Sequence, residues 1–447
     1  MVGFHEKLLN SNVTFVVGSC IRIKVTYQSM KIIATSDWHI GNLFHGNDRL
    51  PEHKHFMNWL LDQLQIQRPD ALLIAGDVFD NSNPSAAAQS AYYEFLAEAT
   101  ERCRGMNIII TAGNHDSASR LEAPRPMLAK HNVQIRGNVR RTWNDGSWVN
   151  DYDDLIIPIE NAAGEKVVIL AVPYLRSDVI NGSNYSKGVN EFLQSLTCRA
   201  RELYPECTLV MMAHMYAKGS DIALKDASEK IVIGGQEEVN MEGWIDHPDY
   251  MTCGHIHKRQ HIWNTDWARY TGSILPMSFA EVDYRHGVDM ISFSGTGART
   301  VEFLEYTPQH KLRIMPDTDE DFTEAKLKKL IKSSLPDRGT DGRLSDSFEY
   351  IVLRVKQEKV NNDLIRELEA LVNSKDAVLC RIQKIIPGLS VNTVVGNKSL
   401  TSIEDILDRD PMETLNEAFV IKHQSEMNER QSAMLNDIVT NIRNEYK

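Results

Sequence analysis

The sequence predicts an α/β domain that extends from residue 30 to about residue 306. Short apolar runs of strand length alternate there with amphipathic stretches, as in a sheet whose strands are covered on both faces. The stretches 53–65 and 86–99 carry apolar residues three and four positions apart, the spacing of a helix with one buried face. The predicted strands are residues 31–35, 71–75, 107–112, 167–172, 208–213, 250–253, 288–293 and 299–304.

Length, composition and charge describe a globular protein. The 447 residues allow two or three domains, and 42% hydrophobic and 25% charged residues are ordinary values. A net charge of -12 argues against strong charge-driven binding of nucleic acid by this chain alone, so such binding would be local or shared with a partner. The six cysteines are scattered without a C-x-x-C pair, which favours free thiols in a reducing compartment. Because no apolar stretch is long enough to span a membrane, we expect a cytoplasmic protein.

The rest of the chain predicts a terminal extension, a second domain and a docking segment. Residues 1–29 precede the first clear strand as an extension expected to be disordered, and their apolar run is too short for an export signal. Residues 307–390 predict a small α/β domain with a helix at 317–333, a strand at 348–355, a helix at 362–373 and a strand at 377–386. Residues 400–447 predict helices whose apolar stripes either dock a partner or pack on the small domain.

Most of the predicted strands end in residues that bind metal ions. In open α/β sheets, ligands bind beyond the carboxyl ends of the strands. Where two candidates lie two residues apart, as in Asp37/His39 and His255/His257, an extended backbone would point both side chains to the same side. The strand-end candidates are Asp37, His39, Asp77, Asn114, His115, Asp116, His214, His255 and His257.

These candidates divide into ligands for two divalent cations. Carboxylate, amide and imidazole groups together suit Mn, Fe or Zn better than Mg, which prefers oxygen ligands. Two such ions about 3.5 to 4 Å apart can clamp the attacking and leaving oxygens when a phosphate ester is cleaved. One ion could be held by Asp37, His39 and His257, the second by Asn114, His214 and His255, and Asp77 could bridge both.

Taken in order, the clusters resemble the calcineurin-like metallophosphoesterases, whose pattern is D-x-H, G-D-x-x-D, G-N-H-D or E, a lone His and G-H-x-H. The resemblance implies a two-layer β-sandwich flanked by helices and the ligand assignments given above. It also implies that His115 is not a ligand but contacts the phosphate and protonates the leaving oxygen, with Asp116 as its orienting partner. The pattern is met by Asp37/His39, Asp77/Asp80, Asn114/His115/Asp116, His214 and His255/His257.

Residues that flank these motifs narrow the range of substrates that we expect the site to cleave. Ser/Thr protein phosphatases usually continue G-D-x-x-D with Arg-Gly, whereas this chain has Asn81-Ser82. The stretches 35–39, 75–80, 113–117 and 270–279 resemble the SbcD family of bacterial exonuclease subunits, the counterpart of the Mre-type nucleases of break repair. This resemblance implies a Mn-dependent exonuclease and endonuclease that processes double-stranded DNA ends and hairpins in DNA repair, recombination and replication. Residues 307–390 would correspond to the capping domain of that family.

The same resemblance implies partners. An SbcC-type coiled-coil ATPase would dock on the helices from residue 400 onward, and a homodimer of this chain would sit within a heterotetramer. No G-x-x-x-x-G-K-[ST] motif occurs here, so the partner would use the ATP. Arg120, Lys258 and Arg259 adjoin the motifs and are candidate DNA contacts. Two alternatives stay open: a cytosolic phosphodiesterase acting on small nucleotides, and a non-catalytic scaffold of a DNA complex.

Overall fold

A computed structural model describes residues 29–180, 184–221, 238–241, 244, 246–293, 299–317, 323–356 and 361–385, together with the backbone of 12–17 and 21–26. The described chain divides into two compact units. The described residues within 1–313, 338–351 and 376–380 belong to one unit, and those within 314–337, 352–375 and 381–385 belong to the other. The helices predicted from residue 400 onward lie outside the described residues. The domain boundaries predicted from the sequence stay a prediction.

Two six-stranded sheets form the centre of the first unit. The first sheet has the order β18-β17-β3-β6-β7-β8, in which β3, β6, β7 and β8 run parallel and β17 and β18 are antiparallel to their neighbours. The inner strands β3, β6 and β7 read as nearly continuous apolar runs because both faces are covered. The bounds are β3 (Met30–Thr35), β6 (Ala71–Ala75), β7 (Asn107–Thr111), β8 (Val133–Arg136), β17 (His286–Phe293) and β18 (Arg299–Tyr306).

The second sheet has the order β11-β12-β13-β14-β16-β15, with β12, β13, β14 and β16 parallel and both edge strands antiparallel. Val167–Ala171 and Leu209–His214 are buried throughout, as expected for strands with no solvent-facing side. The bounds are β11 (Ile156–Glu160), β12 (Lys166–Ala171), β13 (Thr208–His214), β14 (Tyr250–Gly254), β15 (Gln260–His261) and β16 (Ala268–Tyr270).

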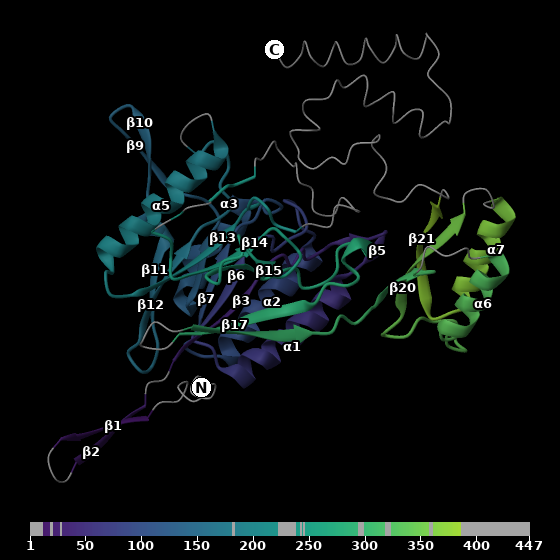
Figure 1. Cartoon of the computed structure of the whole chain (residues 1–447), viewed down its shortest axis with the longest axis horizontal. Coiled ribbons are helices and arrows are strands. Elements are labelled where there is room, and N and C mark those ends of the chain that lie inside the picture. Colours follow the sequence, from purple (N-terminus) through teal and green to yellow (C-terminus); the bar gives the residue numbers. More distant parts are fainter. Residues whose placement is uncertain are drawn as a thin grey trace, which may run out of the picture. The chain divides into compact units, whose positions relative to one another are not determined.

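The two sheets face each other, and helices cover their outer faces (Figure 1). Alternation along β3 shows the layering: Ile32 and Ala34 pack into the core between the sheets, whereas Ile33 packs against the helices. The helices α1 (Leu50–Gln67) and α2 (Ala86–Arg102) cover the first sheet, and α5 (Tyr185–Leu203) covers the second. The predicted sandwich of two sheets flanked by helices is therefore confirmed.

Shorter elements connect these layers. Helices α3 (Ala118–Glu122) and α4 (Arg125–Leu128) lead into β8, and an antiparallel hairpin, β9 (Arg141–Asn144) and β10 (Ser147–Asn150), follows it. Strands β4 (Leu43–Phe44) and β5 (Asn47–Asp48) form a small hairpin before α1. Within the N-terminal extension, the structure describes one antiparallel pair, β1 (Asn12–Val17) and β2 (Ile21–Thr26).

A three-stranded sheet of order β19-β20-β21 follows, made of β19 (Leu312–Met315), β20 (Glu349–Lys356) and β21 (Ala377–Ile385). Helix α7 (Asn362–Asn373) has the predicted bounds. Helix α6 (Glu324–Ser334) begins later than predicted, because the Thr323 side chain accepts a hydrogen bond from the Lys326 N–H and caps the helix there. An ion pair between Lys328 and Glu367 links the two helices.

Two further expectations concern the cysteines and membrane-spanning helices. The cysteines that the structure describes, Cys103, Cys198, Cys207, Cys253 and Cys380, are all free thiols, as their scattered spacing predicted. Among the described helices, none has the length and apolarity that crossing a membrane requires.

One buried histidine makes the stability of the sandwich dependent on pH. His286 begins β17 and is 4% exposed, with Nδ1 2.9 Å from the Ser273 carbonyl oxygen. Burial lowers the pKa of His286 from 6.5 to about 4. The unfolded chain therefore binds one more proton between these two pH values, and stability that is fully present above pH 6.5 falls as the pH drops toward 4.

We expect His286 to account for about 3 kcal/mol of the free energy of unfolding lost across this interval. Urea unfolding at pH 7 and at pH 4.5 measures the loss in the natural chain and in His286→Asn, which cannot titrate. The variant should be less stable at pH 7 and should lose less on acidification. An equal pH-dependent loss in both chains would show that other groups cause it.

Candidate metal centre

The predicted ligands meet at one edge of the sandwich because they follow the carboxyl ends of parallel strands in both sheets. The first sheet supplies three loops, which follow β3, β6 and β7, and the second supplies the ends of β13 and β14. Backbone hydrogen bonds tie the loops together, since the Asp37 N–H donates to the Gly76 carbonyl and the His39 N–H to the Asp77 carbonyl. The residues brought together are Asp37, His39, Asp77, Asn114, His214, His255 and His257.

The backbone at these positions is not extended, which corrects the expected reason for the D-x-H and H-x-H spacing. Asp37, His39 and Asp77 have φ values of 53°, 48° and 48°, and His255 has 98°. Such left-handed conformations are uncommon for residues other than glycine, and each costs about 1 to 3 kcal/mol unless the surroundings impose it. Sharp turns, and not strand alternation, direct the side chains of both motifs into the centre.

Glycines in the motifs allow the loops to approach closely. A Cβ on Gly113 would overlap the Asp77 carboxylate, and one on Gly76 would overlap the His214 ring. Gly76 also has a φ of 82°, which favours glycine for a second reason. The G-D and G-N pairs of the sequence are therefore explained by packing between the loops.

Asp37, His39 and His257 form one group, with potential ligand atoms all within 4.8 Å of one another. All three side chains are buried. His39 Nε2 lies 3.8 Å from the nearer Asp77 oxygen and has no hydrogen-bond partner among the described residues. A buried ring nitrogen without a partner is costly in a protein interior, and a bound cation would satisfy it.

A second group of candidate ligands, His214, Asn114 and His255, also lies close to Asp77. His214 Nε2 lies 3.3 Å from Asp77 Oδ2 and 3.0 Å from Asn114 Oδ1. His255 Nδ1 lies 3.0 Å from the same Asn114 oxygen. Asp77 thus lies close to ligand atoms of both groups, the position that a bridging carboxylate needs.

Burial and mutual charge set the protonation of the centre. Burial lowers the pKa of His255 to about 3 and raises the pKa of Asp37. Burial also disfavours the charged forms of Asp77 and His214, but the attraction between these two groups is stronger. The pKa of His214 therefore rises to about 9, and the pKa of Asp77 falls well below its usual range. In the metal-free chain His214 therefore carries a proton that a bound cation would displace.

His115 lies beside the centre and is oriented by the backbone. Its Nδ1 is 2.8 Å from the Asp80 carbonyl oxygen, and its own N–H donates to Asp77 Oδ1 at 2.9 Å. Because a carbonyl oxygen only accepts, Nδ1 carries the proton and Nε2 is the atom free for other chemistry. His115 also forms a third group of potential ligand atoms with His39 and Asp77.

Asp116 does not orient the His115 ring, and this part of the sequence interpretation is corrected. Its carboxylate accepts the N–H groups of Gly113, Val78 and Phe79 at 2.9 to 3.1 Å, which joins two of the ligand loops. Burial, together with repulsion from Asp77, raises its pKa to about 6. The side chain points into the protein because neighbours in a tight turn diverge, so sequence adjacency to His115 was misleading.

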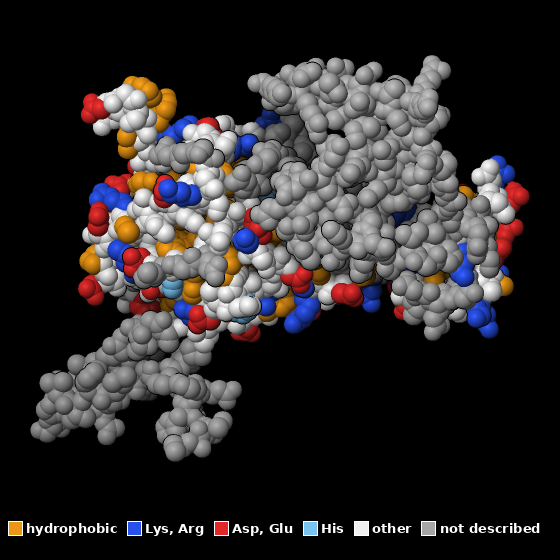
Figure 2. Space-filling model, turned by 45° about the horizontal axis from the view of Figure 1, so that its top comes forward, with side chains coloured by type: hydrophobic (Ala, Val, Ile, Leu, Met, Phe, Trp, Pro, Cys, Tyr) orange, Lys and Arg blue, Asp and Glu red, His pale blue; other side chains and the backbone are white. Residues whose placement is uncertain are grey.

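The three candidate DNA contacts are all engaged with other side chains. Arg259 donates to the buried Asp289 at 2.7 Å and lies over the Phe303 ring, so much of its role is to hold the fold. Lys258 pairs with Asp221, and Arg120 donates to Asn83 at 2.6 Å. On the face seen in Figure 2, described Lys and Arg side chains are interspersed with Asp and Glu.

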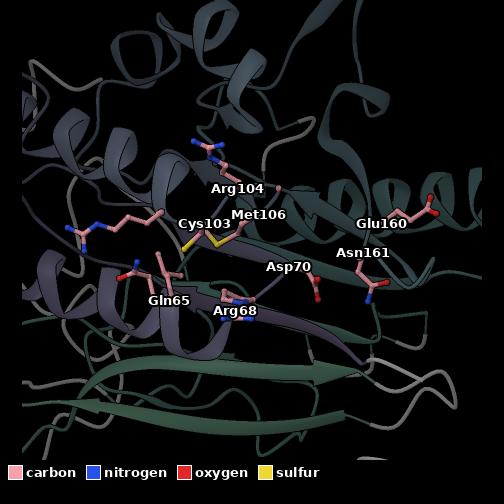
Figure 3. A pocket seen from close by; sticks show the side chains of 13 residues that line it. Gln65, Arg68, Asp70, Cys103, Arg104, Met106, Glu160 and Asn161 are labelled. Atoms are coloured by element: carbon pink, nitrogen blue, oxygen red, sulfur yellow. The ribbon is translucent and has the colours of Figure 1, made fainter. Parts of the chain in front are cut away.

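A surface pocket of about 570 Å³ lies at the opposite edge of the first sheet (Figure 3). Asp70 precedes β6 and Met106 precedes β7, so the pocket faces the amino ends of the parallel strands, away from the ligand loops. None of the described metal-ligand candidates lines it. Arg68, Arg104 and Glu160 give the pocket side chains of both charges, and we assign no part of the metal centre to it.

Sequence reasoning missed two residues beside the centre. Glu281 is fully buried on a short 3-10 turn (Phe279–Glu281), and its Oε1 lies 3.1 Å from His257 Nδ1. Tyr174, in the loop after β12, has its ring centroid 6.1 Å from that of His214. Neither belongs to a metal-binding motif, and no pattern in the sequence separates them from ordinary core residues.

Comparison with known proteins gives the family of the chain. Residues 30–259 match the calcineurin-like phosphoesterase family. The SbcD component of the nuclease SbcCD from Rhodobacter capsulatus is 32% identical over 355 residues, which cover 76% of this chain and 85% of the relative. The proteins of the same name from Escherichia coli K12 and Bacillus subtilis are 29% and 28% identical and cover 62% and 59% of this chain, or 68% and 66% of the relatives. The chain therefore belongs to the calcineurin-like phosphoesterase family and, within it, to the group of the SbcD nuclease proteins.

Proposed function

We propose that this chain is the Mn-dependent nuclease subunit of a DNA-processing complex, cutting double-stranded DNA as an exonuclease and endonuclease at ends and hairpins. The observation that carries the proposal is that Asp77 Oδ2 lies 3.8 Å from His39 Nε2 and 3.3 Å from His214 Nε2, one nitrogen from each group of candidate ligands, since two-metal sites of this kind cleave phosphate esters. The family supports the reaction class, and the names of its relatives, which are nuclease subunits, support a nucleic acid as the substrate.

The ligand set fits two divalent cations. Asp37, His39 and His257 would hold one cation and Asn114, His214 and His255 the other, with Asp77 near enough to both groups to be shared. The imidazole-rich N/O donor set favours Mn over Mg. The ring nitrogen of His214 that faces away from the centre has a backbone partner. Its Nδ1 is 3.0 Å from the Ala75 carbonyl oxygen, and this contact turns Nε2 toward the centre. When bound, the ions supply Lewis-acid stabilisation and an activated water.

His115 would protonate the leaving oxygen from Nε2, which requires the ring to carry a proton on Nε2 as well as the one that Nδ1 donates to Asp80. Its Nδ1 is fixed on the Asp80 carbonyl, so Nε2 is directed to where a substrate phosphate would bind. The chain has Asn81-Ser82 where phosphatases of this family usually have Arg-Gly, which favours a phosphodiester over a phosphoprotein substrate. An SbcC-type ATPase is the proposed partner; it docks on residues 400–447, uses the ATP and forms a heterotetramer around a homodimer of this chain.

The test uses purified chain with Mn on end-labelled hairpin and linear duplex DNA and on bis(p-nitrophenyl) phosphate, with and without the co-expressed ATPase. We expect metal-dependent cutting of DNA that chelation abolishes and that the ATPase accelerates. Hydrolysis of small nucleotide diesters without DNA cutting would instead identify a cytosolic phosphodiesterase. Absence of hydrolysis on every substrate, with DNA binding retained, would identify a non-catalytic scaffold.

We expect Glu281 to strengthen cation binding at the first site by orienting His257. Its carboxylate accepts from His257 Nδ1 at 3.1 Å and from the Met277 N–H at 2.8 Å, which fixes the ring with Nε2 toward Asp37. Removing such an outer partner typically weakens metal binding about 10- to 100-fold. We expect this loss in Glu281→Ala and a smaller one in Glu281→Gln, measured by calorimetric Mn titration. Equal Mn affinity in Glu281→Ala and the natural chain would contradict the assignment.

A further inference from the structure

A tyrosine and an arginine border the metal centre on the side of His214. The Tyr174 ring centroid lies 6.1 Å from that of His214, and the Arg176 Cζ lies 5.9 Å from the Tyr174 ring centroid. The Tyr174 ring is therefore in contact range of both a candidate ligand, His214, and the Arg176 guanidinium. Neither residue belongs to the ligand motifs.

The loop that carries them is fixed at both sheets. The Val172 N–H donates to the Met212 carbonyl in the second sheet, and the Tyr174 N–H donates at 2.8 Å to the Ala112 carbonyl, directly before the Gly113-Asn114 turn. Leu175 is 4% exposed, and its carbonyl accepts the Tyr185 hydroxyl at 2.7 Å. The position of Tyr174 and Arg176 is therefore set by the same framework that sets the ligands.

Arg176 has its charge available for a ligand. Its side chain is exposed, and no carboxylate among the described residues forms an ion pair with it. This distinguishes it from Arg259, which is paired with a buried aspartate, and from Lys258, which is paired with Asp221. Tyr174 contributes a phenolic O–H donor, and its ring contacts His214 on one hand and the Arg176 guanidinium on the other.

We propose that Arg176 and Tyr174 bind the phosphate that neighbours the scissile one in a polynucleotide strand. A small diester offers only the phosphate at the cations, whereas a polynucleotide offers further phosphates along the strand, which a guanidinium binds through charge-assisted hydrogen bonds. The pair would therefore select polynucleotides over small phosphodiesters. This inference rests on the proposed nuclease function and gives a strongly acidic chain a local cationic contact for DNA.

The experiment compares kcat/KM of Arg176→Ala, Arg176→Lys and Tyr174→Phe for duplex DNA and for bis(p-nitrophenyl) phosphate at several salt concentrations. We expect Arg176→Ala to lower kcat/KM for DNA about 10-fold more than for the small ester and to reduce the salt dependence of DNA binding by about one phosphate contact. Arg176→Lys should recover part of the loss, and Tyr174→Phe should show a smaller effect in the same direction.

Arg104→Ala is the matched control. Arg104 is also exposed and without an ion pair among the described residues, but it lies in the pocket at the opposite edge of the sheet (Figure 3), so both activities should be unchanged. Equal losses of Arg176→Ala on both substrates, or none on either, would overturn the inference while leaving the nuclease function in place. If the natural chain hydrolyses the small ester but never DNA, the proposed function fails and the inference fails with it.

Discussion

Replacing Asp77 by Asn is expected to lower phosphodiester hydrolysis about 10³-fold or more. Asp77 lies 3.8 Å from His39 Nε2 and 3.3 Å from His214 Nε2, so its carboxylate is the group shared by both proposed cation sites. An amide has the same shape but no charge, and its nitrogen cannot coordinate a cation. Loss of the bridge removes several kcal/mol of charge stabilisation, and each 1.36 kcal/mol is tenfold in rate.

Calorimetric titration separates a binding defect from a defect in chemistry. The natural chain should bind two Mn ions, and Asp77→Asn should lose at least one of them. The matched control is Asp62→Asn, which makes the same chemical change at a side chain that is 68% exposed on α1. Full Mn stoichiometry in Asp77→Asn together with normal activity would refute the bridging role.

The sandwich and its ligand set were predictable because two signals agree. Buried parallel strands read as short apolar runs, and β6 (Ala71–Ala75) has the predicted bounds. The residues at the ends of these runs must then share one edge of the fold. Edge strands carry less signal: β8 has the sequence Val-Gln-Ile-Arg, and half of its pattern is polar. Helix α5 was not predicted, although Val189, Phe192, Leu193 and Leu196 form its buried face.

The local geometry of the centre was not predictable from spacing. D-x-H is compatible with an extended strand end, but Asp37 and His39 adopt left-handed turns in loops packed so closely that a Cβ has no room at Gly76 or Gly113. Asp116 illustrates the same limit, since adjacency to His115 suggested a pair that the turn separates. Glu281 reaches His257 from 24 positions away, and such contacts depend on the tertiary fold.

Replacing His115 by Gln is expected to lower kcat on DNA about 10²- to 10⁴-fold while Mn affinity stays within about twofold of the natural value. Geometry alone leaves two roles for this residue, because its ring nitrogen also lies within reach of His39 and Asp77. The hydrogen bond between Nδ1 and the Asp80 carbonyl suits both roles, since His214 makes the same kind of bond to Ala75, so the role of proton donor rests on the position of His115 in the G-N-H-D motif. A ligand would instead lose Mn binding on substitution, so Mn titration of the variant distinguishes the two roles.

The leaving group provides the stricter test of proton donation. DNA cleavage expels an alkoxide, which needs a proton in the transition state, whereas p-nitrophenolate leaves readily without one. The loss in His115→Gln should therefore be much larger on DNA than on bis(p-nitrophenyl) phosphate. His131→Gln, an exposed histidine remote from the ligand loops, should affect neither substrate. If His115→Gln lost the same factor on both esters, His115 would act by binding the phosphate and not by protonating the leaving oxygen.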